Sequence, residues 1–126
     1  MSKIRYTEEH EWLQIGDDGL ITIGITDFAQ NQLGDLVYVQ LPEVGKEYGK
    51  GEEAAVIESV KTAGEIMMPV DGLVVESNTS LADEPGKVNE DALGAGWIFK
   101  IKVNDPDQLD SLMDEAGYKA YVDSLG

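Results

Sequence analysis

Short runs of alternating apolar and polar residues fill most of the chain. The cleanest is Leu20–Ile25, where three isoleucines share one face and Thr22 and Gly24 share the other, the period of a half-buried strand. Similar apolar runs predict strands over 5–15, 36–41, 54–57, 66–70 and 97–103. Many short strands separated by turn residues are typical of a sandwich or barrel, so we predict a mainly β fold.

Two segments change to helical spacing. Thr26 is a candidate N-cap and Gly34 a candidate terminator for a short internal helix. At the tail, Asp105 and Pro106 are typical of a helix start, and we expect this helix to end at Gly117, with a second helix over 118–125. Both tail helices have one apolar stripe and an acidic outer face, so we expect them to lie on the sheet.

The length of 126 residues fits one domain with one core. We assign 1–103 to the β sandwich and 104–126 to the C-terminal helices. The chain contains no apolar run of membrane-spanning length, and its N-terminus lacks the apolar core of a signal peptide. We therefore expect a cytoplasmic protein.

One lysine lies between two of the predicted strands. Lys61 follows the apolar run 54–57 and precedes the run 66–70, with the small residues Thr62, Ala63 and Gly64 directly behind it. Apolar runs joined by small residues predict a hairpin, with Lys61 exposed at its tip. A lysine at a hairpin tip is in most proteins simply a solvated turn residue, so its role depends on the rest of the chain.

A loose internal repeat surrounds this lysine. The segment 34–39 is echoed by 71–76, and 42–46 is echoed by 84–87. If the echo is structural, two similar halves face each other, with Lys61 at one end of the sheets.

Charge and missing residue types exclude several functions. The formal charge of −16 disfavours nucleic acid and membrane surfaces as partners, while it suits either a basic protein partner or simple solubility. The chain has no cysteine and a single histidine, His10, so it lacks a thiol nucleophile and the ligands of most zinc sites. We expect no catalytic residue and no metal, and any redox chemistry must come from an attached group.

Five segments in order resemble the H protein of the glycine cleavage system. They are YTEEHEW (6–12), ITIGITDFAQ (21–30), LGDLVYVQLPEVG (33–45), ESVKTAG (58–64) and GWIFKIK (96–102). The resemblance implies a barrel-sandwich hybrid related to lipoyl and biotinyl domains, with lipoate as a covalent cofactor in amide linkage to Lys61. It also implies that the protein carries the aminomethyl group of glycine rather than acting as an enzyme.

The resemblance also assigns roles to neighbouring residues. The residues around Lys61 that the modifying enzyme is expected to recognise are Glu58, Ser59, Val60, Thr62, Ala63 and Gly64. By position, Glu11, Ile25 and Glu65 match a cleft into which the loaded arm folds, where a carboxylate stabilises an ammonium group. For Glu65, a solvated acid at a strand edge is an equally good interpretation.

The implied partners are the enzymes that the arm visits. They are glycine decarboxylase (P protein), the tetrahydrofolate-dependent aminomethyltransferase (T protein), dihydrolipoyl dehydrogenase (L protein), and a lipoate ligase or lipoyl/octanoyl transferase. We expect the carrier itself to be a monomer.

Two other classes of carrier stay open. An H-like protein that relays lipoyl or octanoyl groups in lipoate metabolism would have the same lysine motif. The segments 63–65, 67–69 and 92–93 depart from the family pattern and leave room for such a relative. A biotinyl carrier is disfavoured, because such domains have methionine on both sides of the lysine, where this chain has Val60 and Thr62.

Overall fold

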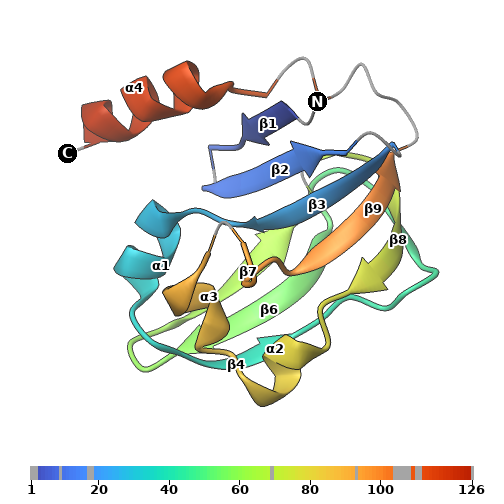
Figure 1. Cartoon of the computed structure of the whole chain (residues 1–126), viewed down its shortest axis with the longest axis horizontal. Helices are drawn as coiled ribbons and strands as arrows, with labels where there is room; N and C mark the ends of the chain where they lie inside the picture. The colour runs from blue at the N-terminus through green and yellow to red at the C-terminus, as the bar shows by residue number, and fades with distance from the viewer. Residues whose placement is uncertain are drawn as a thin grey trace.

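The computed structural model describes residues 3–8, 10–16, 19–68, 70–92, 94–103, 109 and 112–125. Two antiparallel sheets pack against each other (Figure 1), one with the strand order β1-β2-β3-β9-β8-β5 and the other with the order β4-β6-β7. The strands are β1 (Lys3–Tyr6), β2 (Glu11–Ile15), β3 (Leu20–Ile25), β4 (Leu36–Gln40), β5 (Glu47–Tyr48), β6 (Glu53–Ser59), β7 (Ala63–Met67), β8 (Gly72–Ser77) and β9 (Phe99–Val103). The helices are α1 (Asp27–Leu33), α2 (Ser80–Asp83), α3 (Lys87–Glu90) and α4 (Glu115–Leu125).

The inner faces of the two sheets form the core. Ile21 and Ile23 of β3 are fully buried, as the alternation of this segment predicted, and Ile101 of β9 is the register partner of Ile21. Ile57 of β6 and Ile66 of β7 are buried in the same apolar cluster from the other sheet. Burying a side chain of this size contributes about 1.5–3 kcal/mol relative to leaving it exposed, so these layers fix the sheets against each other.

Helix α1 begins and ends where its sequence predicted. The Thr26 hydroxyl accepts a hydrogen bond from the backbone N–H of Ala29 at 3.2 Å, which caps the N-terminus. Gly34 has φ 83°, a left-handed conformation that glycine adopts without strain, and its N–H donates to the Gln30 carbonyl at 2.9 Å. The helix therefore leaves the end of β3 and returns the chain directly to β4.

The first predicted strand is divided. The chain reverses between β1 and β2, and the N–H of His10 donates to the Thr7 carbonyl at 3.1 Å inside this turn. His10 has φ 66°, and it is the only non-glycine residue with positive φ among the described residues. No glycine or proline marks the reversal, which is why the segment 5–15 reads as one continuous strand.

The tail differs from the expectation of two helices broken at Gly117. Gly117 lies inside α4, and its N–H donates to the Asp114 carboxylate at 2.7 Å. This glycine therefore lies in the first turn of a helix capped by Asp114, and the predicted stop was wrong. Met113 instead pairs in antiparallel fashion with Tyr6, which attaches the tail to the edge of β1. The predicted start at 105–106 lies outside the described residues.

The internal repeat is only partly structural. Residues 36–40 and 72–77 are both strands, in different sheets. The second echo fails, because Gly45 has φ 90° in a loop whereas Gly86 has φ −63° directly before α3. The short helices α2 and α3 were not predicted. None of the helices among the described residues is long and apolar enough to cross a lipid bilayer.

Replacement of Gly24 by alanine should destabilise the fold. Gly24 is the register partner of Trp12, and a Cβ at this position would lie 2.7 Å from the indole ring. The ring cannot move aside easily, because it is buried and its Nε1 donates to the Ala92 carbonyl at 2.9 Å. We expect a loss of about 1–3 kcal/mol in the free energy of unfolding, measured by urea denaturation.

The matched control is Gly86→Ala. A Cβ at Gly86 meets nothing within 4 Å. Its stability should stay within about 0.5 kcal/mol of the parent. Equal losses for the two variants would contradict the clash at Trp12.

Candidate functional site

The predicted hairpin is confirmed, and Lys61 lies in its turn. Strands β6 and β7 pair in antiparallel register, with Glu58 opposite Ala63. The N–H of Ser59 donates to the Thr62 carbonyl at 2.8 Å, and the Ser59 hydroxyl oxygen accepts from the N–H of Lys61 at 3.2 Å and of Thr62 at 3.1 Å. The side chain of Ser59 thus fixes the backbone of the turn, while Lys61 itself is exposed.

The stem of Lys61 lies over the end of α1. A Cβ built on Gly34 would be 3.3 Å from Cε of Lys61. Asp35, the residue after Gly34, also contacts the turn, because its carbonyl accepts a hydrogen bond from the N–H of Val60 at 3.0 Å. The lysine therefore projects beside the C-terminus of α1, and a side chain larger than glycine at position 34 would crowd it.

Asn89 of α3 holds this region together. Its amide nitrogen donates to the Gly34 carbonyl at 2.8 Å and to Oε1 of Gln30 at 3.0 Å, and its amide oxygen accepts from the N–H of Leu36 at 2.9 Å. The end of α1 and the start of β4 are thereby tied to one side chain. This role could not be predicted from the sequence, because a lone asparagine in a loop-rich segment is typical of an ordinary turn.

A cavity of about 500 Å³ lies beside the hairpin. One face of α1, including Phe28 and Leu33, forms part of its lining. All three residues that were predicted to form an arm cleft, Glu11, Ile25 and Glu65, line this cavity. Glu11 and Ile25 come together because they are register partners between β2 and β3, and Glu65 reaches the cavity from β7. We call this cavity the arm cleft.

The two carboxylates of the arm cleft lie in different environments. The Glu11 side chain is only 3% exposed, and the hydroxyl of Thr7 lies 3.5 Å from its Oε1. Glu65 is exposed. A charge interacts more strongly in the less polar surroundings of Glu11, so this residue is better suited to stabilise a cation inside the cleft.

His10 also lines the arm cleft, a position that the sequence analysis did not assign to it. The residue is half-buried, and its ring centroid lies 4.5 Å from that of Phe28. Its Nδ1 lies 2.8 Å from the hydroxyl oxygen of Tyr118. Its position next to Glu11 in the sequence was the one available signal.

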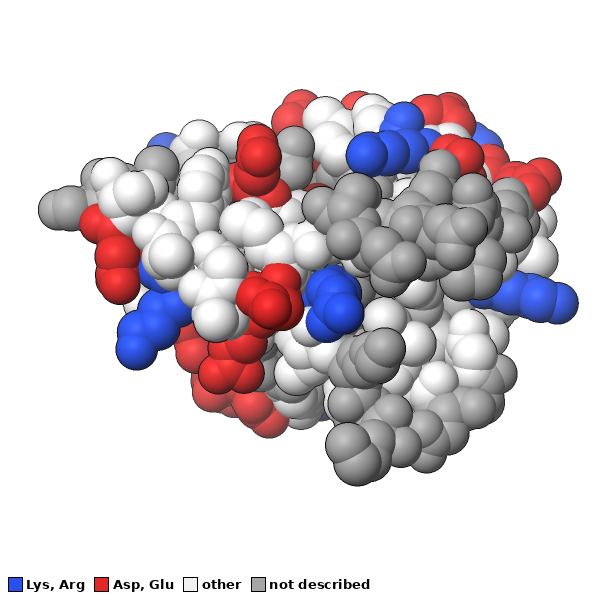
Figure 2. Space-filling view, turned by 90° about the horizontal axis from the view of Figure 1, so that it is seen from above, with Lys and Arg blue, Asp and Glu red and all other residues white. Residues whose placement is uncertain are grey.

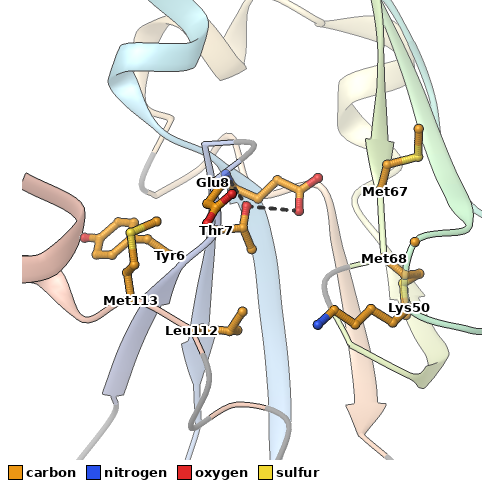
Figure 3. Close-up of a pocket in the computed structure, with 10 residues that line it drawn as sticks. Tyr6, Thr7, Glu8, Lys50, Met67, Met68, Leu112 and Met113 are labelled. Carbon is orange, nitrogen blue, oxygen red and sulfur yellow. Dashed lines mark hydrogen bonds between the residues drawn. The ribbon is translucent and has the colours of Figure 1, made fainter. Parts of the chain in front are cut away.

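A second cavity of about 450 Å³ is also lined by Glu11. Figure 3 shows Tyr6 and Met113 on one side of it, and Met67, Met68 and Lys50 on the other. Glu11 lines both cavities.

The charge of the surface agrees with the composition. On the face above α4 and β1, basic side chains stand apart from one another with acidic side chains between and around them (Figure 2). Among the residues that the structure describes, no cluster of histidine and acidic side chains is arranged to hold a metal ion.

Comparison with known proteins agrees with this geometry. The family model described as "Glycine cleavage H-protein" matches residues 4–125. A glycine cleavage system H protein from Rhodospirillum rubrum is 57% identical over 99% of this chain and 99% of the relative. One from Parvibaculum lavamentivorans is 54% identical over the same shares of both chains.

A solved structure supports the same assignment. The crystal structure of a glycine cleavage system H protein from Mycobacterium marinum superposes with a TM-score of 0.86 at 36% identity, covering 98% of this chain and 97% of that one. Sequence and fold agree over almost the whole length, so this chain belongs to the glycine cleavage H-protein family.

Proposed function

We propose that the protein is the lipoyl carrier of the glycine cleavage system and that lipoate is attached through an amide bond to Nζ of Lys61. In this role it carries the aminomethyl group of glycine from the decarboxylase to the tetrahydrofolate-dependent aminomethyltransferase. The observation that carries the proposal is the position of one exposed lysine, on a fixed turn, beside a cleft that contains a buried carboxylate.

The turn at Lys61 suits a swinging arm. A group that visits several enzymes needs a long flexible tether on a base that does not move. Here the Ser59 hydroxyl and the bond from Val60 to Asp35 hold the base, while the lysine side chain extends from it. Lipoate supplies the dithiol and disulfide chemistry that this cysteine-free chain lacks.

The residues around Lys61 are proposed to be recognised by the modifying enzyme. Val60 is 67% exposed, and Glu58, Thr62 and Ala63 are also exposed, so an enzyme can contact them directly. Ser59 contributes differently, since its hydroxyl is engaged within the turn. Gly64 borders the arm cleft and leaves room near the lysine.

The arm cleft is proposed to hold the loaded arm between visits. Glu11, buried at its wall, would accept a charge-assisted hydrogen bond from the ammonium of the carried group. The apolar lining, including Ile25 and Phe28, would limit access of water to that group. Glu65, at the exposed rim, would assist weakly.

The carrier has no catalytic residue of its own in this proposal. Its partners are glycine decarboxylase, the aminomethyltransferase, dihydrolipoyl dehydrogenase, and a lipoate ligase or lipoyl/octanoyl transferase. The alternative is an H-like relay of lipoyl or octanoyl groups. Glycine-dependent exchange of carbon dioxide with a cognate decarboxylase separates the two, because only the glycine cleavage carrier supports it.

Lys61→Arg should abolish lipoylation and leave the fold intact. Arginine keeps the positive charge but offers no amine that forms the lipoyl amide, and the exposed side chain contributes little to packing. Intact mass after incubation with a lipoate ligase should stay that of the bare chain, while the melting temperature stays within about 2 °C of the parent. A lipoyl adduct on this variant would place the attachment elsewhere.

Glu58→Ala should slow modification more than it affects folding. Glu58 is exposed on β6 directly before the turn, so its loss removes a contact to the enzyme and no packing. We expect a severalfold lower rate of lipoylation, consistent with loss of one hydrogen bond or ion pair at an interface. The control is Glu53→Ala, an exposed acid at the opposite end of the same strand, which should be modified at the parental rate.

Glu11→Gln should shorten the lifetime of the carried group. The substitution keeps the size of the side chain but removes the charge, and hydrogen bonds to charged groups contribute about 1.5–3 kcal/mol. Release of formaldehyde from the loaded carrier in buffer should therefore rise roughly tenfold or more. Glu65→Gln, at the exposed rim, should raise it less than about threefold. Equal effects of the two variants would argue against a special role for Glu11.

A further inference from the structure

The C-terminal helix reaches the arm cleft through one hydroxyl group. The hydroxyl oxygen of Tyr118 in α4 lies 2.8 Å from Nδ1 of His10 and 2.8 Å from Oγ1 of Thr26. His10 lines the arm cleft, and Thr26 caps α1, whose residues line it as well. Tyr118 itself does not line the cleft.

We propose that Tyr118 is a positioning residue. By hydrogen bonding to both His10 and Thr26, its hydroxyl fixes the part of the arm cleft that His10 and Glu11 line. This inference rests on the proposed role of the cleft. It assigns to α4, which lies on the outer side of β1 and β2 (Figure 1), a part in retaining the carried group.

Backbone hydrogen bonds also hold His10 and Thr26 in place. The N–H of Thr26 donates to the His10 carbonyl at 3.0 Å, and the His10 N–H donates to the Thr7 carbonyl. His10 adopts φ 66°, a conformation that a non-glycine residue keeps only when its surroundings fix it. The bond from its ring to Tyr118 is one such restraint, and Glu11 is the next residue in the chain.

Tyr118 is suited to this role by its own surroundings. It is 9% exposed, and its ring stacks on that of Tyr6 with centroids 4.6 Å apart. Burial raises the pKa of its hydroxyl above the ordinary value, with the Thr26 hydrogen bond acting in the opposite direction. The phenol therefore keeps its proton at neutral pH, so it can donate to one of its two partners and accept from the other.

Helix α4 supplies a matched control. Tyr121 lies one turn further along, with its ring centroid 5.8 Å from that of His10. Its hydroxyl donates to the Glu8 carbonyl at 3.3 Å at an exposed position. Tyr121→Phe therefore removes a tyrosine hydroxyl from the same helix and leaves the Tyr118 contacts with His10 and Thr26 in place.

The experiment compares Tyr118→Phe with Tyr121→Phe in the full chain. Tyr118→Phe keeps the ring and its stacking on Tyr6, so thermal unfolding serves to verify that the variant folds. The chain contains one histidine, so the ring nitrogens of His10 give an unambiguous NMR signal. In Tyr118→Phe these signals should move toward those of a histidine in water, whereas in Tyr121→Phe they should stay unchanged.

The second readout is release of formaldehyde from the lipoylated and loaded carrier in buffer. Water replaces the thiol at the aminomethyl carbon, so each event yields one formaldehyde, one ammonium ion and the free thiol. We expect about fivefold faster release for Tyr118→Phe, the equivalent of about 1 kcal/mol for one hydrogen bond, and less than twofold for Tyr121→Phe.

The outcomes separate this inference from the proposed function. If Glu11→Gln speeds release but Tyr118→Phe does not, the role of Tyr118 is wrong and the cleft stands. If neither variant changes release, the cleft does not retain the group, and both proposals fail. Unchanged His10 signals in a folded Tyr118→Phe variant would also overturn the inference.

Discussion

Packing of the two sheets through their buried aliphatic faces is the constraint on which the site depends. The layer that contains Ile21 and Ile101 on one side and Ile57 and Ile66 on the other sets the separation of the sheets. Strand β6 leads directly into the lysine turn, while β2 and β3 carry Glu11 and Ile25. The arm cleft exists because these strands belong to different sheets that meet at one end of the core.

The site combines a hydrogen-bonded turn with an exposed lysine. The turn is held by hydrogen bonds to the Ser59 hydroxyl within it and to the Asp35 carbonyl outside it. Asn89 in turn hydrogen-bonds the Gly34 carbonyl, next to Asp35. The side chain of Lys61 is exposed. Glu11, in contrast, is buried and lines both cavities. The exposed amine of Lys61 and the buried carboxylate of Glu11 thus belong to different parts of the site.

The features that the sequence predicted correctly are those encoded within a few residues. The caps of α1, the alternation in β3 and the small residues behind Lys61 each have a local physical cause. Most of the features that it missed depend on distant contacts. The exception is Gly117, which the nearby Asp114 carboxylate places in the first turn of α4 instead of at a helix stop. The reversal at His10 is held by the distant residues Thr26 and Tyr118. Asn89 has no local signature, because all its partners lie more than fifty positions away.

The resemblance to a family supplied what local pattern could not. Spacing alone left Lys61 as a turn residue, and the grouping of Glu11, Ile25 and Glu65 came from matching motifs. The structure brings these three residues to one cavity, and pairing of β2 with β3 provides the physical reason for two of them.

The position of β9 has a consequence for biosynthesis. This strand is the last in sequence order among the described residues, yet it lies between β3 and β8 in the larger sheet. The β6–β7 hairpin is local and can form as soon as its residues leave the ribosome, whereas the sheet that supports it stays open until residues 99–103 have emerged. A modifying enzyme that recognises the lysine turn on its finished support therefore acts only after residues 99–103 have emerged, and a chain truncated before β9 would present the lysine without the scaffold that positions it.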